Sequence, residues 1–218
     1  MGNYRLDLVT APITEPVTIT EVKGALRIDH NTDDTLIGFL ITTARSNAEA
    51  YTRRAFMTQT WKMYMDSFSG YSQAYPWWSG SNGATSSLSF DIPNNIEVPM
   101  APLQTVTHMK TYDDSDAATT FSAASYFVGA YNGDFAQPGS ITLRTSDSWP
   151  VVYRVKDGIE VQFVAGYGDS AQDVPQMIRM AIQEEAAFLY NNRGSCDGSM
   201  VSSGIAKKML SQFRIIKL

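Results

Sequence analysis

The residues best suited to metal chemistry form the segment Asp29-His30-Asn31-Thr32-Asp33-Asp34. Its Asp-x-Asn-x-Asp spacing is that of a calcium loop, in which alternate side chains supply oxygen ligands. The turn position that needs glycine holds Asp34, however, and the position that needs a bidentate glutamate holds Leu40. The segment is better explained as the start of a helix, because acidic side chains favour the positive end of the helix dipole.

The sequence contains few residues in patterns typical of catalysis or cofactor binding. The G-x-S-x-G, H-E-x-x-H and G-x-x-x-x-G-K motifs do not occur. His30 and His108 have no nucleophile pattern beside them, and Cys196 has no cation within two positions to lower its pKa. Glu184 and Glu185 point in different directions on a helix, which is typical of a surface pair. We therefore expect no catalytic residue, no bound metal and no cofactor.

Three aromatic residues, Tyr75, Trp77 and Trp78, lie close together in a long polar loop over residues 69–87. They can stack on a sugar or a base, bury against a neighbouring subunit, or fold back over the open face of a sheet. Residues 63–109 contain no Lys or Arg, which argues against nucleic acid. The loop is a possible partner-contact site, and a carbohydrate- or receptor-binding β module is the alternative function.

Composition narrows the class of protein. The 218 residues are 44% hydrophobic and 18% charged, with a net charge of −5 and one cysteine. One or two domains with a sizeable core are expected for this length. The acidic balance argues against a DNA-coating surface or an anionic membrane partner. A single cysteine excludes an internal disulfide framework, and without a signal peptide or a long apolar run we expect production in the cytoplasm.

Helical patterns lie at the two ends of the chain. Thr18 and Glu21 form a capping-box match that predicts a short helix to about Ile28. A 3.6-residue apolar stripe predicts a second helix to about Thr52. A third begins at Val174-Pro175 and continues to about Asn192. The apolar stripes are Ile37, Leu40, Ile41, Ala44, Ala48 and Tyr51 in the second helix, and Ile178, Ala181, Ile182, Ala186 and Leu189 in the third.

Between these helices the pattern is that of strands. Thr and aromatic residues alternate from about residue 56 to 66, and further strands are expected near 88–92, 95–98, 103–112, 125–131, 140–145 and 159–165. Turn residues separate them. Residues 1–16 are polar and interrupted by Pro12 and Pro16, and we group them with the N-terminal helical part.

The sequence therefore predicts an α+β protein. Its helical frame comes from the N- and C-terminal segments, and an antiparallel β-sandwich or barrel-like domain is inserted between them. The expected parts are an N-terminal helical part over 1–56, an inserted β domain over 57–169 with a mobile loop at 69–87, and a C-terminal helix and tail over 170–218.

The order of several short motifs resembles the head–tail connector (adaptor) proteins of long-tailed double-stranded DNA phages, the group with a central β insertion. The resemblance covers about residues 14–194. It is carried most clearly by Thr58-Gln59-Thr60-Trp61 and Ala165-Gly166-Tyr167-Gly168, which flank the β region. The pattern departs from the family in the 69–87 loop and after Arg193.

This resemblance implies a structural protein rather than an enzyme. Members form rings, usually of twelve subunits, below the portal protein, extend the DNA channel and provide a platform for a neck, stopper or tail-terminator protein. It also implies that the protein lies in the neck of the virion. DNA would pass through the channel without sequence-specific binding. Twelve copies would carry a charge of about −60, which repels DNA from the channel wall.

Two sets of assembly residues are expected in such a ring. Charged side chains on the second and third helices are candidates for contacts between neighbouring copies: Arg45, Glu49, Arg53, Arg179, Glu184 and Glu185. The C-terminal residues Phe213, Arg214, Ile215, Ile216, Lys217 and Leu218 are candidates for portal docking, because a frayed chain end with exposed aliphatic side chains needs a cover.

Overall fold

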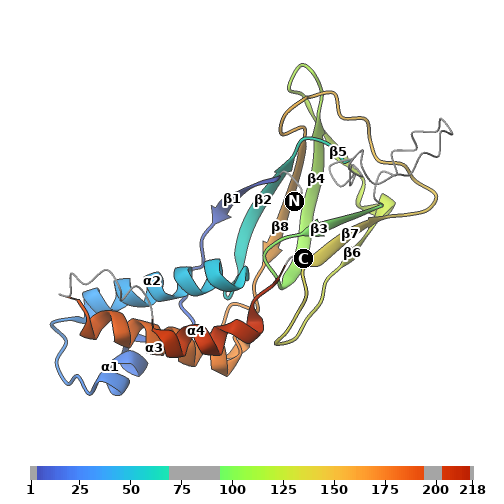
Figure 1. Ribbon diagram of the computed structural model, residues 1–218. Coiled ribbons are helices and arrows are strands. Elements are labelled where there is room, and N and C mark those ends of the chain that lie inside the picture. Colours follow the sequence, from blue (N-terminus) through green and yellow to red (C-terminus); the bar gives the residue numbers. More distant parts are fainter. Residues whose placement is uncertain (1–3, 69–93, 194–202, 217–218) are drawn as a thin grey trace, which may run out of the picture.

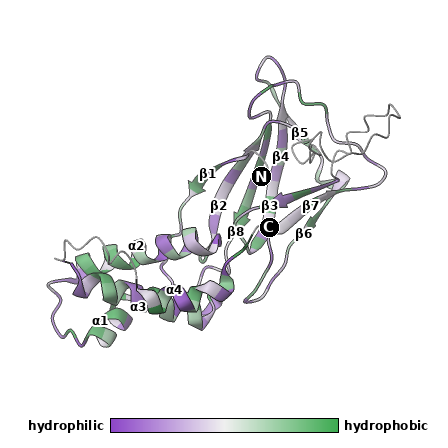
Figure 2. Cartoon of the chain, viewed as in Figure 1, coloured by the Kyte–Doolittle hydropathy of each residue, from purple (hydrophilic) through white to green (hydrophobic). Residues whose placement is uncertain are grey.

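The structure is a computed structural model that describes residues 4–68, 94–193 and 203–216. Figure 1 shows the helices gathered at one end of the molecule and the strands at the other. Each end has its own core of buried apolar side chains. Hydrophobic residues accordingly occur throughout both parts in Figure 2. The predicted α+β class with a helical frame and a β insertion is confirmed.

The helical part consists of α1 (Ile19–Leu26), α2 (Asp34–Thr52), α3 (Gln176–Asn191) and α4 (Gly204–Leu210). The capping box of α1 is present: Glu21 N–H donates to Thr18 Oγ1, and Thr18 N–H donates to the Glu21 carboxylate at 2.7 Å. α2 packs on α3, with Ile37, Ile41 and Ala44 of α2 in the shared core. N- and C-terminal helices thus form one unit, as the sequence predicted.

Among the described residues, the β part contains two antiparallel sheets. The first has the order β1-β2-β8-β4-β5 and the second the order β3-β7-β6. Their apolar faces share one core, which includes Met63 of β2, Phe163 of β8 and Ile141 of β7. The strands are β1 (Tyr4–Thr10), β2 (Gln59–Met65), β3 (Asn95–Val98), β4 (Leu103–Tyr112), β5 (Ala118–Phe121), β6 (Tyr126–Gly129), β7 (Gly139–Leu143) and β8 (Ile159–Ala165). Short 3-10 turns lie at Ala123–Ser125, Ala171–Asp173 and Ser211–Phe213.

β1 differs from the sequence prediction. Residues 4–10 form the edge strand of the larger sheet and pair antiparallel with β2. The N-terminal segment therefore contributes to the β part as well as to the helical frame. β5 was also missed. The strand expected near 88–92 and the loop residues Tyr75, Trp77 and Trp78 lie outside the described residues.

The two motifs that flank the β insertion lie side by side where it joins the helices. Thr58 N–H donates to the Gly168 carbonyl at 3.1 Å, and Tyr167 N–H donates to the Phe56 carbonyl at 3.1 Å. Gly166 has a φ of +136°, and a Cβ there would lie 2.3 Å from the Met57 carbonyl oxygen. Glycine is needed at this crossing, because it allows both the positive φ and the close backbone approach.

Candidate assembly surfaces

Two of the predicted ring residues, Arg45 and Glu49, form an internal network at the end of α2. Arg45 donates to Glu49 at 2.7 Å and to Glu15 at 2.7 Å. The other Glu49 oxygen accepts from Phe56 N–H at 2.9 Å and from the Gln59 amide at 2.6 Å. Burial raises the pKa of Glu49, and Arg45 and the two hydrogen bonds offset this only in part. The network joins α2 to β2.

Glu185 and Arg179 of α3 are also engaged within the chain. Glu185 is buried and accepts a hydrogen bond from Ser203 N–H at 2.8 Å, at the start of α4. Arg179 donates to Glu21 at 2.7 Å and to the Pro16 carbonyl at 3.0 Å. Its guanidinium therefore holds α1 against α3.

The expectation that all six charged residues face a neighbouring copy is therefore corrected. Arg45, Glu49 and Glu185 are buried inside the subunit, where their partners come from segments distant in sequence. Arg179 is half-buried with partners of its own. Arg53 and Glu184 are exposed, and their place in a ring contact stays a prediction.

The first half of the C-terminal tail is folded back on its own chain. Phe213 is buried, and its ring stacks on Phe135 with centroids 5.0 Å apart. The Phe213 carbonyl accepts from Arg54 Nε at 2.6 Å, and Ile215 N–H donates to the Thr52 carbonyl at 3.1 Å. Phe213 is thus an anchor of the subunit core. Ile216 is 72% exposed, while Lys217 and Leu218 lie outside the described residues.

A basic corner, which we define as Arg53, Lys207, Lys208 and Arg214, surrounds the point where the tail leaves α4. The Arg214 guanidinium lies 5.2 Å and the Lys207 ammonium 5.7 Å from the centroid of the Tyr51 ring. Within residues 4–68, 94–193 and 203–216, no carboxylate forms an ion pair with these four cations. The corner is a positive patch on an acidic protein and suits an acidic surface.

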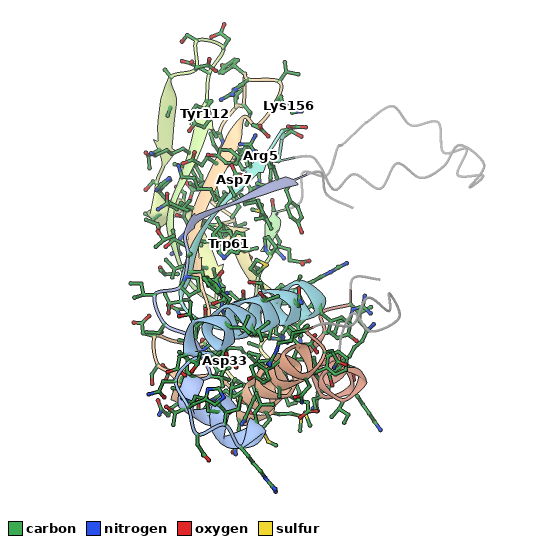
Figure 3. All side chains as sticks on the ribbon, turned by 90° about the vertical axis from the view of Figure 1, so that its left-hand side faces the viewer. Arg5, Asp7, Asp33, Trp61, Tyr112 and Lys156 are labelled. Atoms are coloured by element: carbon green, nitrogen blue, oxygen red, sulfur yellow. The ribbon has the colours of Figure 1, made fainter. Side chains whose placement is uncertain are left out.

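Glu160 organises a polar cluster on the face of the larger sheet that points away from the second sheet. It is only 3% exposed. Its carboxylate lies 2.9 Å from His108 Nε2, 3.0 Å from the Tyr112 hydroxyl and 3.2 Å from Lys62 Nζ. Desolvation alone would raise the pKa of Glu160, but hydrogen bonds from His108, Tyr64, Lys62 and Tyr112 lower it to about 2. The cluster therefore connects side chains of the neighbouring strands β2, β8 and β4. Tyr112 is labelled on this sheet in Figure 3.

We expect Glu160→Gln to lower the free energy of unfolding at pH 7 by about 2 kcal/mol. The folded-state pKa is depressed from 4.5 to about 2, so the stabilisation is present above pH 4.5 and lost as the pH falls toward 2. Urea unfolding of both proteins at pH 7 and pH 3 measures this. The stability difference should shrink at pH 3, and a difference that stays constant would show that the carboxylate charge has no role.

A metal site or membrane segment is not seen in the described part of the chain. No cluster of three or more His, Cys, Asp or Glu side chains there can hold a metal ion. Nor does any helix among those residues combine the length and the hydrophobicity needed to cross a bilayer. Two of the three acidic residues of the calcium-like segment have partners within the chain: Asp33 accepts from the Tyr190 hydroxyl, and Asp34 pairs with Lys23 at 2.8 Å. Figure 3 labels Asp33 in the helical part.

The described residues form an α+β fold, in which four helices make one unit and two packed β-sheets make the other. Comparison with known proteins specifies this class further. Residues 16–111 match the family described as phage gp6-like head-tail connector protein. This match confirms the resemblance to head–tail connector proteins that the sequence motifs indicated. The comparison with curated proteins gives no match.

Solved structures share the fold over nearly the whole chain. A chain from the neck of an empty GTA particle, computed with C6 symmetry, aligns with a TM-score of 0.73 and 19% identity, covering 98% of this chain and 97% of that one. A chain from the virion of a native gene transfer agent particle aligns with a TM-score of 0.72, 20% identity and coverages of 98% and 96%. A chain from the neck of a native GTA particle, computed with C12 symmetry, aligns with a TM-score of 0.66 and 20% identity, covering 98% of this chain and 97% of that one.

Proposed function

We propose that this chain is a head–tail connector subunit in the neck of a tailed phage or phage-like particle. The observation that carries this proposal is the match to the connector family together with a fold shared with neck proteins over 98% of the chain. In this role the chain is structural and not catalytic. Its copies form a ring, which we take to be of twelve subunits, below the portal protein.

The ring extends the DNA channel and provides the platform for a stopper or tail-terminator protein. An acidic subunit suits this position, because repeated negative charge keeps DNA from adhering to the wall. The C6 and C12 symmetries of the GTA necks support repeated copies around the channel. The alternative of a carbohydrate- or receptor-binding module depends on Tyr75, Trp77 and Trp78, which lie outside the described residues, and no observation favours it.

The C-terminal end is the proposed portal-docking element. Phe213 and Ile215 hold the tail against the subunit through ring stacking and a backbone hydrogen bond. Ile216, the next residue, is exposed. The neighbouring basic corner would face an acidic portal surface. The earlier expectation placed all of Phe213–Leu218 at the portal. Because Phe213 is buried and Ile215 is hydrogen-bonded to Thr52, we now propose that the docking element begins at Ile216.

We expect deletion of residues 216–218 to leave the subunit folded but to abolish its joining to portal-bearing filled heads. Ile216 is 72% exposed, so its loss should change the free energy of unfolding by no more than about 0.5 kcal/mol. A deletion that began at residue 212 would also remove the buried Phe213, so a loss of stability could not be separated from a loss of portal binding. Sedimentation of labelled subunit with heads measures the joining. Normal joining by the truncated chain would place portal docking elsewhere.

A further inference from the structure

The exposed face of α2 has an unusual composition for a surface helix. We define it as the outer α2 face: Thr35, Leu36, Phe39, Thr42, Thr43, Ser46, Asn47 and Ala50. None of these side chains is charged, because Arg45 and Glu49 of the same helix are turned inward. A helix face that stays in water normally carries charged side chains. Depletion of charge with an aromatic residue present is the composition of an interface centre.

Hydrogen bonds within the helix make the outer α2 face less polar than its sequence suggests. The Thr43 and Ser46 hydroxyls donate to backbone carbonyls four residues earlier, at 2.8 and 2.9 Å, while the Thr42 hydroxyl lies 3.0 Å from the Glu15 carboxylate and 3.2 Å from the Gly38 carbonyl. Little hydrogen-bonding capacity would be lost if this face were covered by apolar groups.

A shallow depression of about 470 Å³ lies along one side of this face. Val17, Ile19, Gly38 and Ile41 are among the residues that line it, and Phe39, which is 68% exposed, stands at its rim. Gly38 adds little bulk to this surface, and even a Cβ there would make only an ordinary contact, 3.9 Å from the tip of Ile19. The depression can receive one or two apolar side chains.

Two exposed methionines lie on the opposite side of the helical part. Met177 is 44% and Met180 is 51% exposed on α3. They are three residues apart and share one helix face, while Ile178 and Ile182 on the other face belong to the core shared with α2. The outer faces of α2 and α3 therefore point in opposite directions from the layer between them.

We infer that Met177 and Met180 of one copy pack into the depression beside Phe39 of the next copy. This inference rests on the proposed ring. A closed ring needs a head-to-tail contact between two different faces of the subunit. The outer α2 face and the methionine pair of α3 are different, apolar and on opposite sides, which meets this requirement. Methionine is flexible and fills irregular hollows well. A second copy is thus the occupant that these observations favour.

Cross-linking in assembled necks tests the contact. In a Cys196→Ser background, Phe39→Cys and Met180→Cys are placed in one chain and produced in particle-forming cells. The two positions lie on opposite sides of a subunit, so a disulfide joins only different copies. Mild oxidation should give a ladder of cross-linked oligomers at least tenfold above the matched control, Phe39→Cys with Phe127→Cys on exposed β6. Each single variant should give no ladder.

Native mass spectrometry of the same necks separates the possible failures. A ring without a ladder above the control overturns this contact and leaves the proposed function standing. Cross-links from Phe39→Cys to a different neck protein also overturn it, because another partner then covers the outer α2 face. Necks that contain no ring of this chain contradict the proposed function itself. Phe39→Asp provides a second check: it should keep the wild-type Tm of the free subunit and reduce incorporation into necks at least tenfold.

Discussion

Replacing Glu49 with alanine is expected to lower the free energy of unfolding by about 3 to 5 kcal/mol. The Glu49 carboxylate binds Arg45 on α2 and also accepts from Phe56 N–H and the Gln59 amide, so its removal leaves several buried donors without an acceptor. Because this network joins the helical part to β2, the loss should reduce the cooperativity between the two parts. Urea unfolding followed by circular dichroism and by tryptophan fluorescence measures both effects.

Two control variants make this expectation specific. Glu49→Gln keeps an acceptor for Phe56 N–H and the Gln59 amide but turns its own NH2 group toward the Arg45 guanidinium, so its loss of stability should be smaller than that of Glu49→Ala but larger than that of an exposed change. Glu184→Ala on the exposed face of α3 should change the free energy of unfolding by less than about 0.5 kcal/mol. Equal losses for Glu49→Ala and Glu184→Ala would mean that the network does not hold the two parts together.

Replacing Arg54 with alanine is the second large effect that we expect, a loss of about 3 kcal/mol in the free energy of unfolding. Arg54 is buried and donates to the Phe213 carbonyl at 2.6 Å and to the Ala136 carbonyl at 2.7 Å. It therefore ties the end of α2 to the tail and to the loop between β6 and β7. Without the guanidinium, both carbonyls lose a buried partner.

The tail should respond to this change before the rest of the subunit. Carboxypeptidase digestion in native buffer should remove residues through Phe213 faster in Arg54→Ala than in the wild type. Lys208→Ala, an exposed change on α4 close to the same tail, serves as the matched control and should digest at the wild-type rate. Unchanged digestion of Arg54→Ala would show that the remaining contacts of the tail, which are the stacking on Phe135, the core packing of Phe213 and the Ile215 to Thr52 hydrogen bond, hold it without Arg54.

Local patterns predicted much of the fold because their signals lie within a few residues. The Thr18 to Glu21 capping box sets the start of α1, and long alternating segments gave the bounds of β4 and β8. β1 was missed although Tyr4, Leu6 and Leu8 alternate with polar residues, because the run is short and two prolines follow it. Its partner, β2, lies more than fifty residues away, so no local signal shows the pairing.

The assembly residues were harder to predict because burial depends on distant segments. Arg45 and Glu49 are four residues apart on α2, a spacing that allows an ion pair, and they form one. That this pair lies inside the subunit follows from Glu15, Phe56 and Gln59, which reach it from other parts of the chain. Likewise, the apolar ending of the tail was visible in the sequence, but the anchoring of Phe213 by Arg54 was not.

A ring of copies of this chain between head and tail, as we propose, would be visible in a cryo-electron microscopy reconstruction of the neck of particles that carry this chain, without imposed symmetry. We expect a closed ring of copies, twelve in number, that contacts the portal on one side and surrounds the DNA path. Density for the chain as single copies, or at any place other than the head–tail junction, would contradict it.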